Sequence, residues 1–332
     1  MNISPESQVL ERHLDLLNQG SVLFAGNVTD NFPQQLKSQK IPTHVWSWYF
    51  DYAKDFSEEA CTFGSHCYQQ ADLILFYWTK NKLENQFQLL QLLSKAPIGQ
   101  KVLIIGENRS GVRSAEKLLA PYGEIAKIDS ARRCSLYHFE LTEKVNFNFD
   151  EFWKTTEFMP NFNVASLPGV FSANVLDEGT KLLLSTLDNR HFFGDILDLG
   201  CGAGVIGTYI KQKFPNIHLV MSDIHAMALE SSRRTLLINN LMGDVIASDV
   251  FSHIEGKFDV ILSNPPFHDG LDTAYRAVTA LITQAKWHLK EGGELRIVAN
   301  RHLPYPDLLD QHLGSHEVLA KNNKFVVYSV HN

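Results

Sequence analysis

The chain has 332 residues, of which 44% are hydrophobic and 20% charged, and its formal net charge is −7. This composition is that of a globular protein long enough for two domains, each with its own core. No run approaches the roughly 18 apolar residues of a membrane span, and the charged residues among positions 1–20 exclude the apolar run of a signal peptide. The acidic balance argues against a general nucleic-acid-coating protein, which carries a basic excess, but not against a site-specific RNA enzyme with a local basic face.

The N-terminal region predicts a helix, because Ser4 precedes Pro5-Glu6 in the order of a capping residue, a first-turn proline and a first-turn acid. The cysteines lie without a C-x-x-C pair at Cys61, Cys67, Cys134 and Cys201. Without an export signal, this pattern predicts reduced thiols and a cytoplasmic location. His66 beside Cys67 is too weak a pattern for a metal site, so no metal is expected.

In the first half, apolar runs at 22–26, 73–78 and 101–109 indicate strands of the same kind as those further along. A linker is expected within 145–163, where five aromatic residues (Phe147, Phe149, Phe152, Trp153 and Phe158) predict packing against a domain. In the second half, strands are predicted at 195–199, 218–222, 245–247, 258–262, 294–298 and 325–330, and helices at 205–213, 226–239 and 273–289. This alternation predicts an α/β fold with a doubly wound, Rossmann-like parallel sheet and a late antiparallel strand.

The two halves share spaced features that suggest an internal duplication. Asn108-Arg109 and Asn300-Arg301 lie 192 positions apart, and Tyr137 and Tyr328 lie 191 apart. If the halves are copies, the first has lost the residues that carry chemistry in the second, since Phe24 stands where Asp198 does. We therefore predict two tandem Rossmann-like domains, with a degenerate scaffold domain at 1–150, a linker at 151–165 and a catalytic domain at 166–332.

A glycine-rich loop follows the strand at 195–199 and opens the helix at 205–213. Its glycines are Gly200, Gly202 and Gly204, and glycines at such a turn let a ligand approach the backbone closely. The loop alone is ambiguous, because with Gly207 it also satisfies the dinucleotide fingerprint, and Asp223 lies near the distance of a ribose-binding acid. A nicotinamide-dependent oxidoreductase and a tight turn without ligand both remain alternatives.

Three acids favour a different ligand. Asp198 lies inside an apolar strand and needs a cationic or donor partner, which the amino-acid moiety of S-adenosylmethionine supplies, whereas a pyrophosphate would be repelled. Asp223 is placed to accept from ribose hydroxyls. Asp249 is placed to accept from the adenine amino group, with Val250 or Phe251 against the ring, although Asp249 also fits a helix N-cap.

The sequence Asn264-Pro265-Pro266-Phe267 ends the strand at 258–262. Consecutive prolines hold an extended backbone without N–H groups, so carbonyl oxygens stay available as acceptors. The Asn264 side-chain oxygen and the Pro265 carbonyl can each accept one hydrogen of a target –NH2 group, and Phe267 can stack on a flat base. No strong general base is required, and His268 after the turn is more simply a polar wall residue. The alternative is a proline-rich turn.

Together these motifs resemble the class I methyltransferase fold and, over the whole chain, the bacterial 16S ribosomal RNA guanine-N2 methyltransferase C family (RsmC). The resemblance includes the degenerate first copy, Leu167-Pro168-Gly169-Val170-Phe171-Ser172, the glycine loop and Asn264-Pro265-Pro266-Phe267-His268. It implies a donor site of Asp198, Gly200, Gly202, Gly204, Asp223 and Asp249 for S-adenosylmethionine. It also implies a guanine site of Asn264, Pro265 and Phe267.

The resemblance further implies N2-methylguanine in helix 34 of 16S rRNA as product and the assembled 30S subunit as substrate. We also expect a monomer that acts without a membrane or a metal. The family usually has Arg-Asp after the Leu167–Ser172 segment, whereas this chain has Ala173-Asn174, which leaves the roles of Phe171 and Asn174 open. Affinity for RNA then comes from a local basic face. The candidates, each of which also fits a solvated surface, are Arg132-Arg133, Lys211, Lys213 and Arg233-Arg234.

Four other functions remain to be weighed. A protein glutamine N5-methyltransferase also suits Asn-Pro-Pro, but typically has Tyr after the prolines and a helical N-terminal domain. A DNA adenine or cytosine methyltransferase would need a target-recognition insertion, and none is visible. A nicotinamide-dependent dehydrogenase would need residues that anchor its substrate, and nothing in this sequence marks such residues. A non-catalytic ribosome-binding protein would have no reason to keep the motifs of the second copy.

Overall fold

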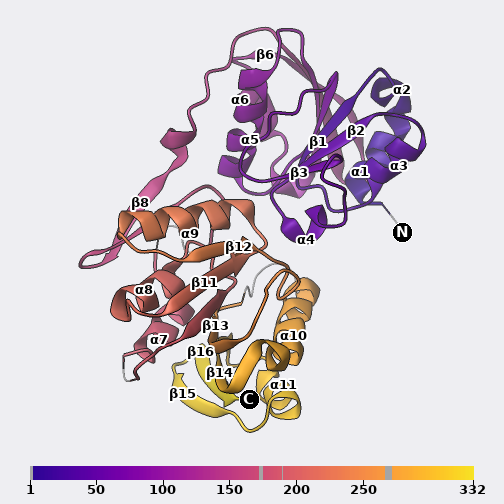
Figure 1. Ribbon diagram of the computed structural model, residues 1–332. Helices are drawn as coiled ribbons and strands as arrows, with labels where there is room; N and C mark the ends of the chain where they lie inside the picture. Colours follow the sequence, from indigo (N-terminus) through magenta and orange to yellow (C-terminus); the bar gives the residue numbers. More distant parts are fainter. Residues whose placement is uncertain (1–2, 172–174, 189, 266–270) are drawn as a thin grey trace. The chain divides into compact units, whose positions relative to one another are not determined.

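The computed structural model describes residues 3–171, 175–188, 190–265 and 271–332 (Figure 1). The chain forms two compact units, Met1–Phe152 and Trp153–Asn332. Within the described ranges, every helix is too short or too polar to cross a membrane.

The first unit is built on a seven-stranded sheet with the order β3-β2-β1-β4-β5-β7-β6. Its strands are β1 (Val22–Gly26), β2 (Thr43–Ser47), β3 (Cys61–Phe63), β4 (Leu73–Tyr77), β5 (Lys101–Glu107), β6 (Gly123–Ala131) and β7 (Cys134–Leu141). Its helices are α1 (Pro5–Leu10), α2 (Leu14–Leu17), α3 (Phe32–Ser38), α4 (Phe50–Ala53), α5 (Lys82–Lys95) and α6 (Ser114–Leu119), with 3-10 turns η1 (Glu11–His13), η2 (Asn108–Ser110) and η3 (Phe149–Phe152). The predicted first helix is confirmed, since Ser4 accepts from the Ser7 N–H as N-cap of α1.

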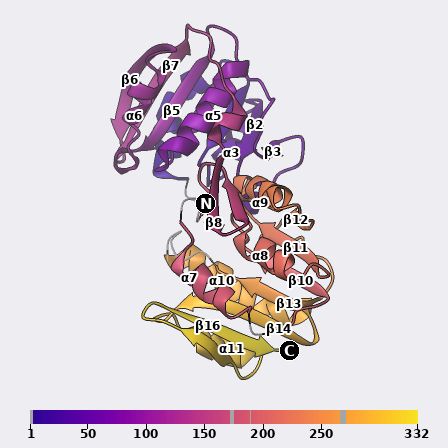
Figure 2. The ribbon, with the colours of Figure 1, turned by 90° about the vertical axis from the view of Figure 1, so that its left-hand side faces the viewer.

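The second unit repeats this sheet with the order β12-β11-β10-β13-β14-β16-β15, beside the separate hairpin β8-β9. Its strands are β8 (Lys154–Met159), β9 (Phe162–Ser166), β10 (Asp195–Leu199), β11 (His218–Asp223), β12 (Asp244–Ala247), β13 (Phe258–Ser263), β14 (Leu289–Asn300), β15 (Glu317–Lys321) and β16 (Phe325–His331). Its helices are α7 (Glu178–Ser185), α8 (Val205–Lys213), α9 (Ala226–Ile238), α10 (Leu271–His288) and α11 (Tyr305–His312). Figures 1 and 2 show α10 and α11 on the other side of this sheet from α8 and α9.

The matching strand orders confirm the predicted pair of Rossmann-like domains. In each sheet the first five strands are parallel and the sixth is antiparallel, as predicted for the end of the chain. The two tyrosines that suggested a duplication occupy equivalent places. Tyr137 on β7 pairs with Ile104 on β5, and Tyr328 on β16 pairs with Ile297 on β14. Parallel strands buried on both faces explain why these segments read as continuous apolar runs.

The copies differ at the carboxyl end of the first strand. In the first unit, a Cβ placed on Gly26 would lie 2.0 Å from the Tyr77 carbonyl oxygen. The neighbouring strand β4 therefore occupies the space beside Gly26. The ring of Phe24, which stands where Asp198 stands in the second unit, lies 6.1 Å from the rings of both Phe32 and Tyr77. Aromatic side chains therefore fill the position where a ligand would need open space and polar groups.

The segment around residues 151–165 packs at each of its ends against the unit to which that end belongs. Within the first unit, Phe147, Phe149 and Phe152 pack edge-on against Phe87 of α5, with ring centroids 5.0 to 5.2 Å apart. Within the second unit, β9 runs along α9 and bonds to its side chains, since the Ala165 N–H donates to Thr235 Oγ1 at 3.0 Å. These contacts fix the chain that leads into residues 167–171.

A buried ion pair holds the carboxyl end of α7 against the second sheet. Arg296 on β14 is fully buried and donates to Glu294 Oε1 at 2.7 Å. The same guanidinium donates to the Thr186 carbonyl oxygen at 2.8 Å, at the last turn of α7, where helix carbonyls lack partners. Although burial alone would raise the pKa of Glu294, its bonds from Arg296 and Ser329 lower the pKa below its usual value. The carboxylate thus stays ionised and holds the Arg296 guanidinium, whose bond to Thr186 fixes the end of α7.

Candidate active site

The glycine loop between β10 and α8 leaves open space above two of its glycines. Gly200, Gly202 and Gly204 all have positive φ, at 76°, 54° and 80°. Among the described residues, a Cβ on Gly200 would meet nothing within 4 Å, and one on Gly202 would meet the Phe171 carbonyl oxygen alone, at 3.8 Å. A Cβ on Gly204 would instead lie 2.9 Å from Ser232 Oγ on α9. The structure therefore gives Gly204 a packing role and leaves Gly200 and Gly202 facing space that a ligand can fill.

Most backbone N–H groups of this loop are already bonded within the protein. The N–H groups of Gly200 and Cys201 both donate to the Ser222 carbonyl oxygen, at 2.8 and 2.9 Å. The Gly202 N–H donates to Asp223 Oδ2 at 2.9 Å. The Gly204 N–H donates to the Cys201 carbonyl oxygen at 2.8 Å. A pyrophosphate site needs such groups free to point at the ligand, so this loop is a poor dinucleotide cradle.

Asp198 lies beneath the loop and is completely buried. Its Oδ2 accepts the Gly207 N–H at 2.8 Å, whereas its Oδ1 has no hydrogen-bond partner among the described residues. Burial raises the pKa of Asp198 to about 7; the Gly207 N–H opposes this shift and the nearby charge of Asp223 adds to it. A buried carboxyl with a vacant oxygen is costly, and a cationic ligand nearby would stabilise its ionised form.

Asp223 ends β11 beside the loop and is half-buried. Its Oδ2 accepts the Gly202 N–H and its Oδ1 accepts the His225 N–H, both at 2.9 Å. Each carboxylate oxygen has further lone pairs, so these two bonds fix the side chain without exhausting it as an acceptor. Asp223 therefore stands rigidly at the edge of the open space, in the place predicted for a ribose-binding acid.

Asp249 follows β12 at the start of a short turn and is half-buried. Its backbone N–H donates to Ser252 Oγ at 3.0 Å, and its carbonyl accepts from the Ser252 N–H. The next residue, Val250, has a φ of 51°, a left-handed conformation that β-branched residues rarely adopt. Of the two side chains expected against an adenine ring, Val250 is half-buried, whereas Phe251 is buried and stacks on His288 at 4.3 Å.

Asn264 follows β13 at the carboxyl edge of the sheet, and its side chain is held from one side. Its Nδ2 donates to Asp177 Oδ2 at 3.0 Å and to Thr180 Oγ1 at 2.9 Å. Its Oδ1 is buried and has no hydrogen-bond partner among the described residues. The neighbouring Pro265 is also buried. The amide thus presents a vacant acceptor beside a backbone position that cannot donate.

Asp177 and Thr180 belong to the site although the sequence did not single them out. Asp177 is the N-cap of α7 and accepts the Thr180 N–H at 2.9 Å. The available signal was the order Asp-x-x-Thr ahead of an apolar run, which marks a helix start. Nothing in that local pattern reveals a partner 87 positions away.

The segment before α7 lies against the loop. Leu167 and Val170 are buried, whereas Phe171 is 53% exposed and its carbonyl is the nearest atom to the Cβ position of Gly202. An exposed aromatic residue whose backbone lies beside the loop is a candidate ligand contact. Of the residues discussed above, Ser172, Ala173, Asn174, Pro266, Phe267 and His268 lie outside the described residues.

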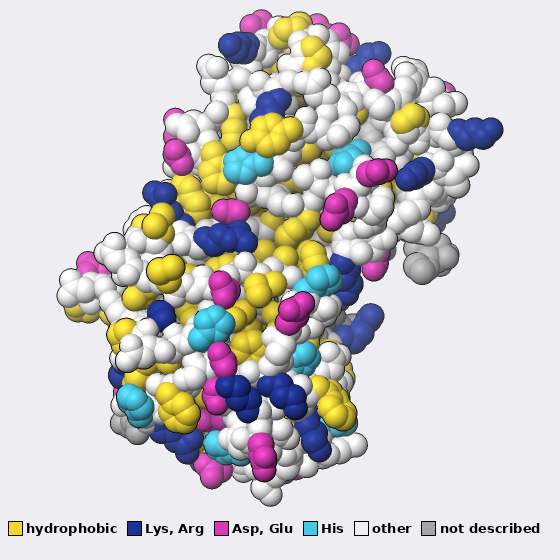
Figure 3. Space-filling model, in the orientation of Figure 1, with side chains coloured by type: hydrophobic (Ala, Val, Ile, Leu, Met, Phe, Trp, Pro, Cys, Tyr) yellow, Lys and Arg dark blue, Asp and Glu magenta, His cyan; other side chains and the backbone are white. Residues whose placement is uncertain are grey.

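The predicted basic residues separate into two groups. Four of them contact groups of their own unit. Lys211 donates to the Pro215 and Ile217 carbonyl oxygens, and Lys213 pairs with Asp188. Arg233 pairs with Glu230, and Arg234 lies over the Trp153 ring. Arg132 and Arg133 are exposed and, in the described parts of the chain, neither forms an ion pair. On the face drawn in Figure 3, basic and acidic side chains are interspersed. Lys213 and Arg233 are paired with carboxylates, whereas Arg132 and Arg133 combine exposure with the absence of an ion pair among the described residues.

Arg132 and Arg133 form the two-residue turn between β6 and β7. Both have positive φ, at 53° and 61°, as in a type I′ hairpin turn. Such turns strongly favour Asn-Gly, because other side chains are strained there. Two arginines at these positions violate the local rule, and such violations are expected at functional sites.

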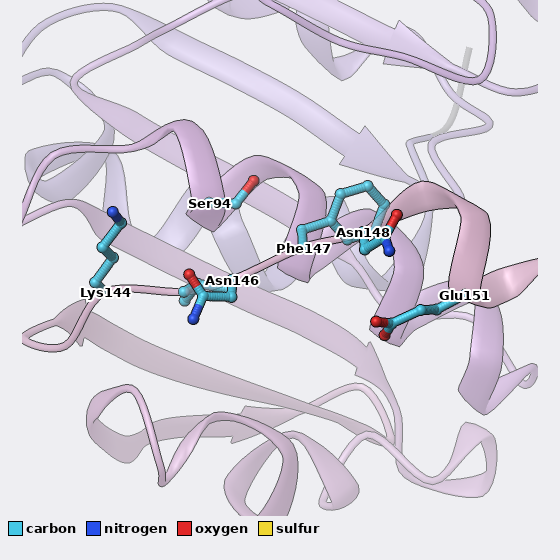
Figure 4. A pocket seen from close by; sticks show the side chains of 7 residues that line it. Ser94, Lys144, Asn146, Phe147, Asn148 and Glu151 are labelled. Atoms are coloured by element: carbon cyan, nitrogen blue, oxygen red, sulfur yellow. The ribbon is translucent and has the colours of Figure 1, made fainter.

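A shallow pocket of about 380 Å³ lies elsewhere, within the first unit (Figure 4). It lies between the end of α5 and the chain that follows β7, and its lining residues are Ser94, Lys144, Val145, Asn146, Phe147, Asn148 and Glu151. None of the predicted site residues lines it.

Comparison with known proteins decides between the alternatives. Two family models match, "Methyltransferase small domain N-terminal" over residues 7–156 and "Methyltransferase small domain" over residues 161–329. A ribosomal RNA small subunit methyltransferase C from Pasteurella multocida is 64% identical over 99% of both chains. Its counterpart from Haemophilus influenzae strain PittEE is also 64% identical, over 99% of this chain and 100% of that one.

The chain belongs to the ribosomal RNA small subunit methyltransferase C family. Membership confirms the expected family and enzyme class and leaves no place for the dehydrogenase, DNA-methyltransferase, glutamine-methyltransferase and non-catalytic readings. A solved T. thermophilus 16S rRNA N2 G1207 methyltransferase (RsmC) in complex with AdoMet and guanosine shares the fold, with a TM-score of 0.85 and 20% identity over 99% of this chain and 92% of that one.

The packing role of Gly204 in this methyltransferase is testable through stability. We expect Gly204→Ala to lower the free energy of unfolding by more than Gly256→Ala, since both glycines have positive φ but only Gly204 would clash with Ser232. Strain alone costs about 1 kcal/mol, and overpacking adds roughly 1–3 kcal/mol. Calorimetric unfolding of the two variants measures the difference. Equal destabilisation would show that Gly204 is not packed as described.

Proposed function

We propose that this methyltransferase moves a methyl group from S-adenosylmethionine to the exocyclic N2 of a guanine in 16S rRNA. The proposed target is the guanine equivalent to G1207 named for the T. thermophilus relative, in helix 34 of the assembled 30S subunit. Family membership supports small-subunit ribosomal RNA as the substrate class. The choice of guanine, and of its N2 atom, is supported by the chemistry of Asn264 and by the guanosine named for that relative.

The observation that carries the proposal is that Oδ1 of Asn264 has no hydrogen-bond partner within the described ranges. Its Nδ2 is occupied by Asp177 and Thr180, so the amide meets the substrate as a hydrogen-bond acceptor. An acceptor here fits an –NH2 group, whose hydrogens it can hold while the nitrogen lone pair faces the incoming methyl carbon. The Pro265 carbonyl is proposed to accept the second hydrogen. Phe267, outside the described residues, is proposed to stack on the base.

The residues around the glycine loop fit the proposed methyl donor. The space above Gly200 and Gly202 would admit its amino-acid portion, and the vacant Oδ1 of Asp198 matches an ammonium group nearby. Asp223 would accept the ribose hydroxyls, and Asp249 with Val250 would receive the adenine. When bound, the donor supplies a methyl carbon activated by an adjacent sulfonium. Gly204, predicted as a ligand contact, is proposed to act instead by packing α8 on α9.

The protein's contribution to the chemistry is alignment rather than proton abstraction. Asn264 and Pro265 would orient the amino group, while Asp223 and the loop fix the donor, and holding reactants in line is worth several kcal/mol of the barrier. Once the new bond has formed, the nitrogen carries an excess proton, which can pass to water. His268 therefore has no required role.

The proposed RNA contact is the Arg132-Arg133 turn. Guanidinium groups bind phosphate oxygens bidentately, and these two are exposed and strained into a conformation that Asn-Gly would adopt more easily. Stability alone does not explain arginine there, whereas phosphate binding does. A local contact of this kind reconciles a net charge of −7 with an RNA substrate.

Asn264→Ala is expected to abolish methyl transfer while leaving donor affinity within a few fold, because it removes the acceptor but not the loop. Transfer of tritiated methyl to 30S subunits, to naked 16S rRNA and to a release factor, with identification of the product nucleoside, measures this. Wild-type enzyme should yield N2-methylguanine from 30S subunits. Full activity of the variant, or a different wild-type product, would contradict the proposal.

Asp198 is expected to make donor binding depend on pH. Because an ammonium ligand favours the ionised carboxyl, affinity for S-adenosylhomocysteine should rise as the pH increases through about 7, with proton release at pH 7. Calorimetry in two buffers of different ionisation enthalpy counts these protons. Asp198→Asn should abolish the release and weaken binding. A flat pH profile in the wild type would leave Asp198 with a purely structural role.

Replacing Arg132-Arg133 by Asn-Gly should change stability and RNA affinity in opposite directions. The hairpin gains its preferred turn residues, so the melting temperature of the first unit rises. Affinity for 30S subunits falls. The slope of log affinity against log salt concentration becomes shallower by the loss of one to two phosphate contacts, on the order of one unit of slope per contact. The pair Lys37→Ala and Lys40→Ala removes the same charge from the same unit as a control. Unchanged affinity in the Asn-Gly variant would exclude this turn from the RNA interface.

A further inference from the structure

We propose that Asp177, the N-cap of α7, is a positioning residue that determines which end of the Asn264 amide faces the substrate. The proposal rests on the function proposed above, since it explains how Asn264 comes to act as an acceptor. Asp177 touches neither reacting group in this account. It acts through the 3.0 Å hydrogen bond from Asn264 Nδ2 to its Oδ2.

An asparagine amide has two similar ends, one accepting and one donating. Rotation by 180° would place Nδ2 toward the substrate and Oδ1 toward α7 with little change in shape. Thr180 does not prevent this, because its hydroxyl both accepts and donates. An ionised carboxylate only accepts, so Asp177 can bond to Nδ2 and would face the oxygen lone pairs of a rotated amide. Asp177 is thus the neighbour that distinguishes the two orientations.

The orientation matters because the proposed target is itself a donor. An outward Oδ1 accepts a hydrogen of the exocyclic amino group. An outward Nδ2 would meet that amino group donor against donor and would leave its nitrogen unaligned. A buried, unpaired polar contact of this kind costs about 1–3 kcal/mol, and the misalignment adds to it.

Asp177 is held firmly enough to impose this preference. Its Oδ2 also accepts the Thr180 N–H at 2.9 Å, and a carboxylate at a helix N-terminus is favoured by the helix dipole. The other end of α7 is fixed by Arg296, which donates to the Thr186 carbonyl oxygen. The amide therefore contacts a helix restrained at both ends.

Helix capping by itself accounts for an Asp at this position, so the test must separate capping from orientation. Asp177→Asn is suited to this, because Asn caps helices as well as Asp and has the same size. Its amide can, however, donate to a rotated Asn264. We expect kcat for methyl transfer to fall on the order of tenfold to a hundredfold. Affinity for S-adenosylhomocysteine and the melting temperature should stay at the wild-type values.

Asp188→Asn provides a matched control, since it makes the same substitution in the same unit at a carboxylate that binds Lys213 and Tyr209 instead. Asp177→Ser is a second variant. Its hydroxyl can still cap the helix, but the side chain is too short to accept the hydrogen bond from Asn264. It should lose kcat as Asp177→Asn does. Loss of kcat in Asp188→Asn as well would attribute the effect to charge and overturn the proposal.

A reciprocal exchange gives the sharpest readout. Asn264→Asp alone places two carboxylates next to each other and should be nearly inactive. In the double variant Asp177→Asn with Asn264→Asp, the amide introduced at position 177 can donate to the carboxylate introduced at position 264, whose other oxygen faces the substrate as an acceptor. We expect the double variant to be at least about tenfold more active than Asn264→Asp, a coupling of roughly 1.4 kcal/mol.

The outcomes separate this inference from the proposed function. If wild-type enzyme forms no N2-methylguanine, the proposed function fails first. If it does, and Asp177→Asn keeps the wild-type kcat or the exchange gives no rescue, the positioning role of Asp177 is wrong while the function stands. A lower kcat with unchanged donor affinity, together with rescue, supports it.

Discussion

The hydrogen bond between Asn264 and Asp177 joins the carboxyl edge of the sheet to the N-terminus of α7, 87 positions earlier in the chain. It uses the donating end of the amide and leaves the accepting end, Oδ1, buried and without a hydrogen-bond partner in the described parts of the chain. A methyl-transfer site for an amino group requires that combination. Near the glycine loop, the buried Asp198 and the half-buried Asp223 supply acidic groups that fit a cationic donor and disfavour a phosphate.

The duplicated fold shows which features packing preserves and which a ligand site requires. Both sheets have the same strand order, because each must bury parallel strands between helices. In the first unit, Phe24, Phe32 and Tyr77 pack together at the carboxyl end of β1. In the second, no described residue covers the Cβ position of Gly200, and one carboxyl oxygen of Asp198 has no hydrogen-bond partner among the residues described. Those unfavourable features of the second unit need a functional explanation. The packed aromatic rings of the first unit need none.

Much of this arrangement could be predicted from the sequence, because it depends on local patterns. The spacing of apolar residues and the positions of the glycines predicted β10 and α8 with their observed bounds. The motif that begins at Asn264 marked the end of β13. The missed elements depend on contacts distant in sequence. The β8-β9 hairpin is held by side chains of α9, and α7 is fixed by Arg296, more than a hundred positions later. The role of Asp177 was invisible for the same reason.

The sequence also could not separate glycines that face a ligand from glycines that allow packing. Gly202 and Gly204 are the same residue type with positive φ in one loop, and it is the position of Ser232 that gives Gly204 a packing role.

A crystal structure of the enzyme with S-adenosylhomocysteine and guanosine would test the central claim most directly. The account predicts guanine N2 within about 3 Å of Asn264 Oδ1, with Asn264 Nδ2 still bonded to Asp177. A guanine whose amino group points away from Asn264, or a dinucleotide-like ligand pose in which the loop N–H groups leave Asp223 and Ser222, would contradict it.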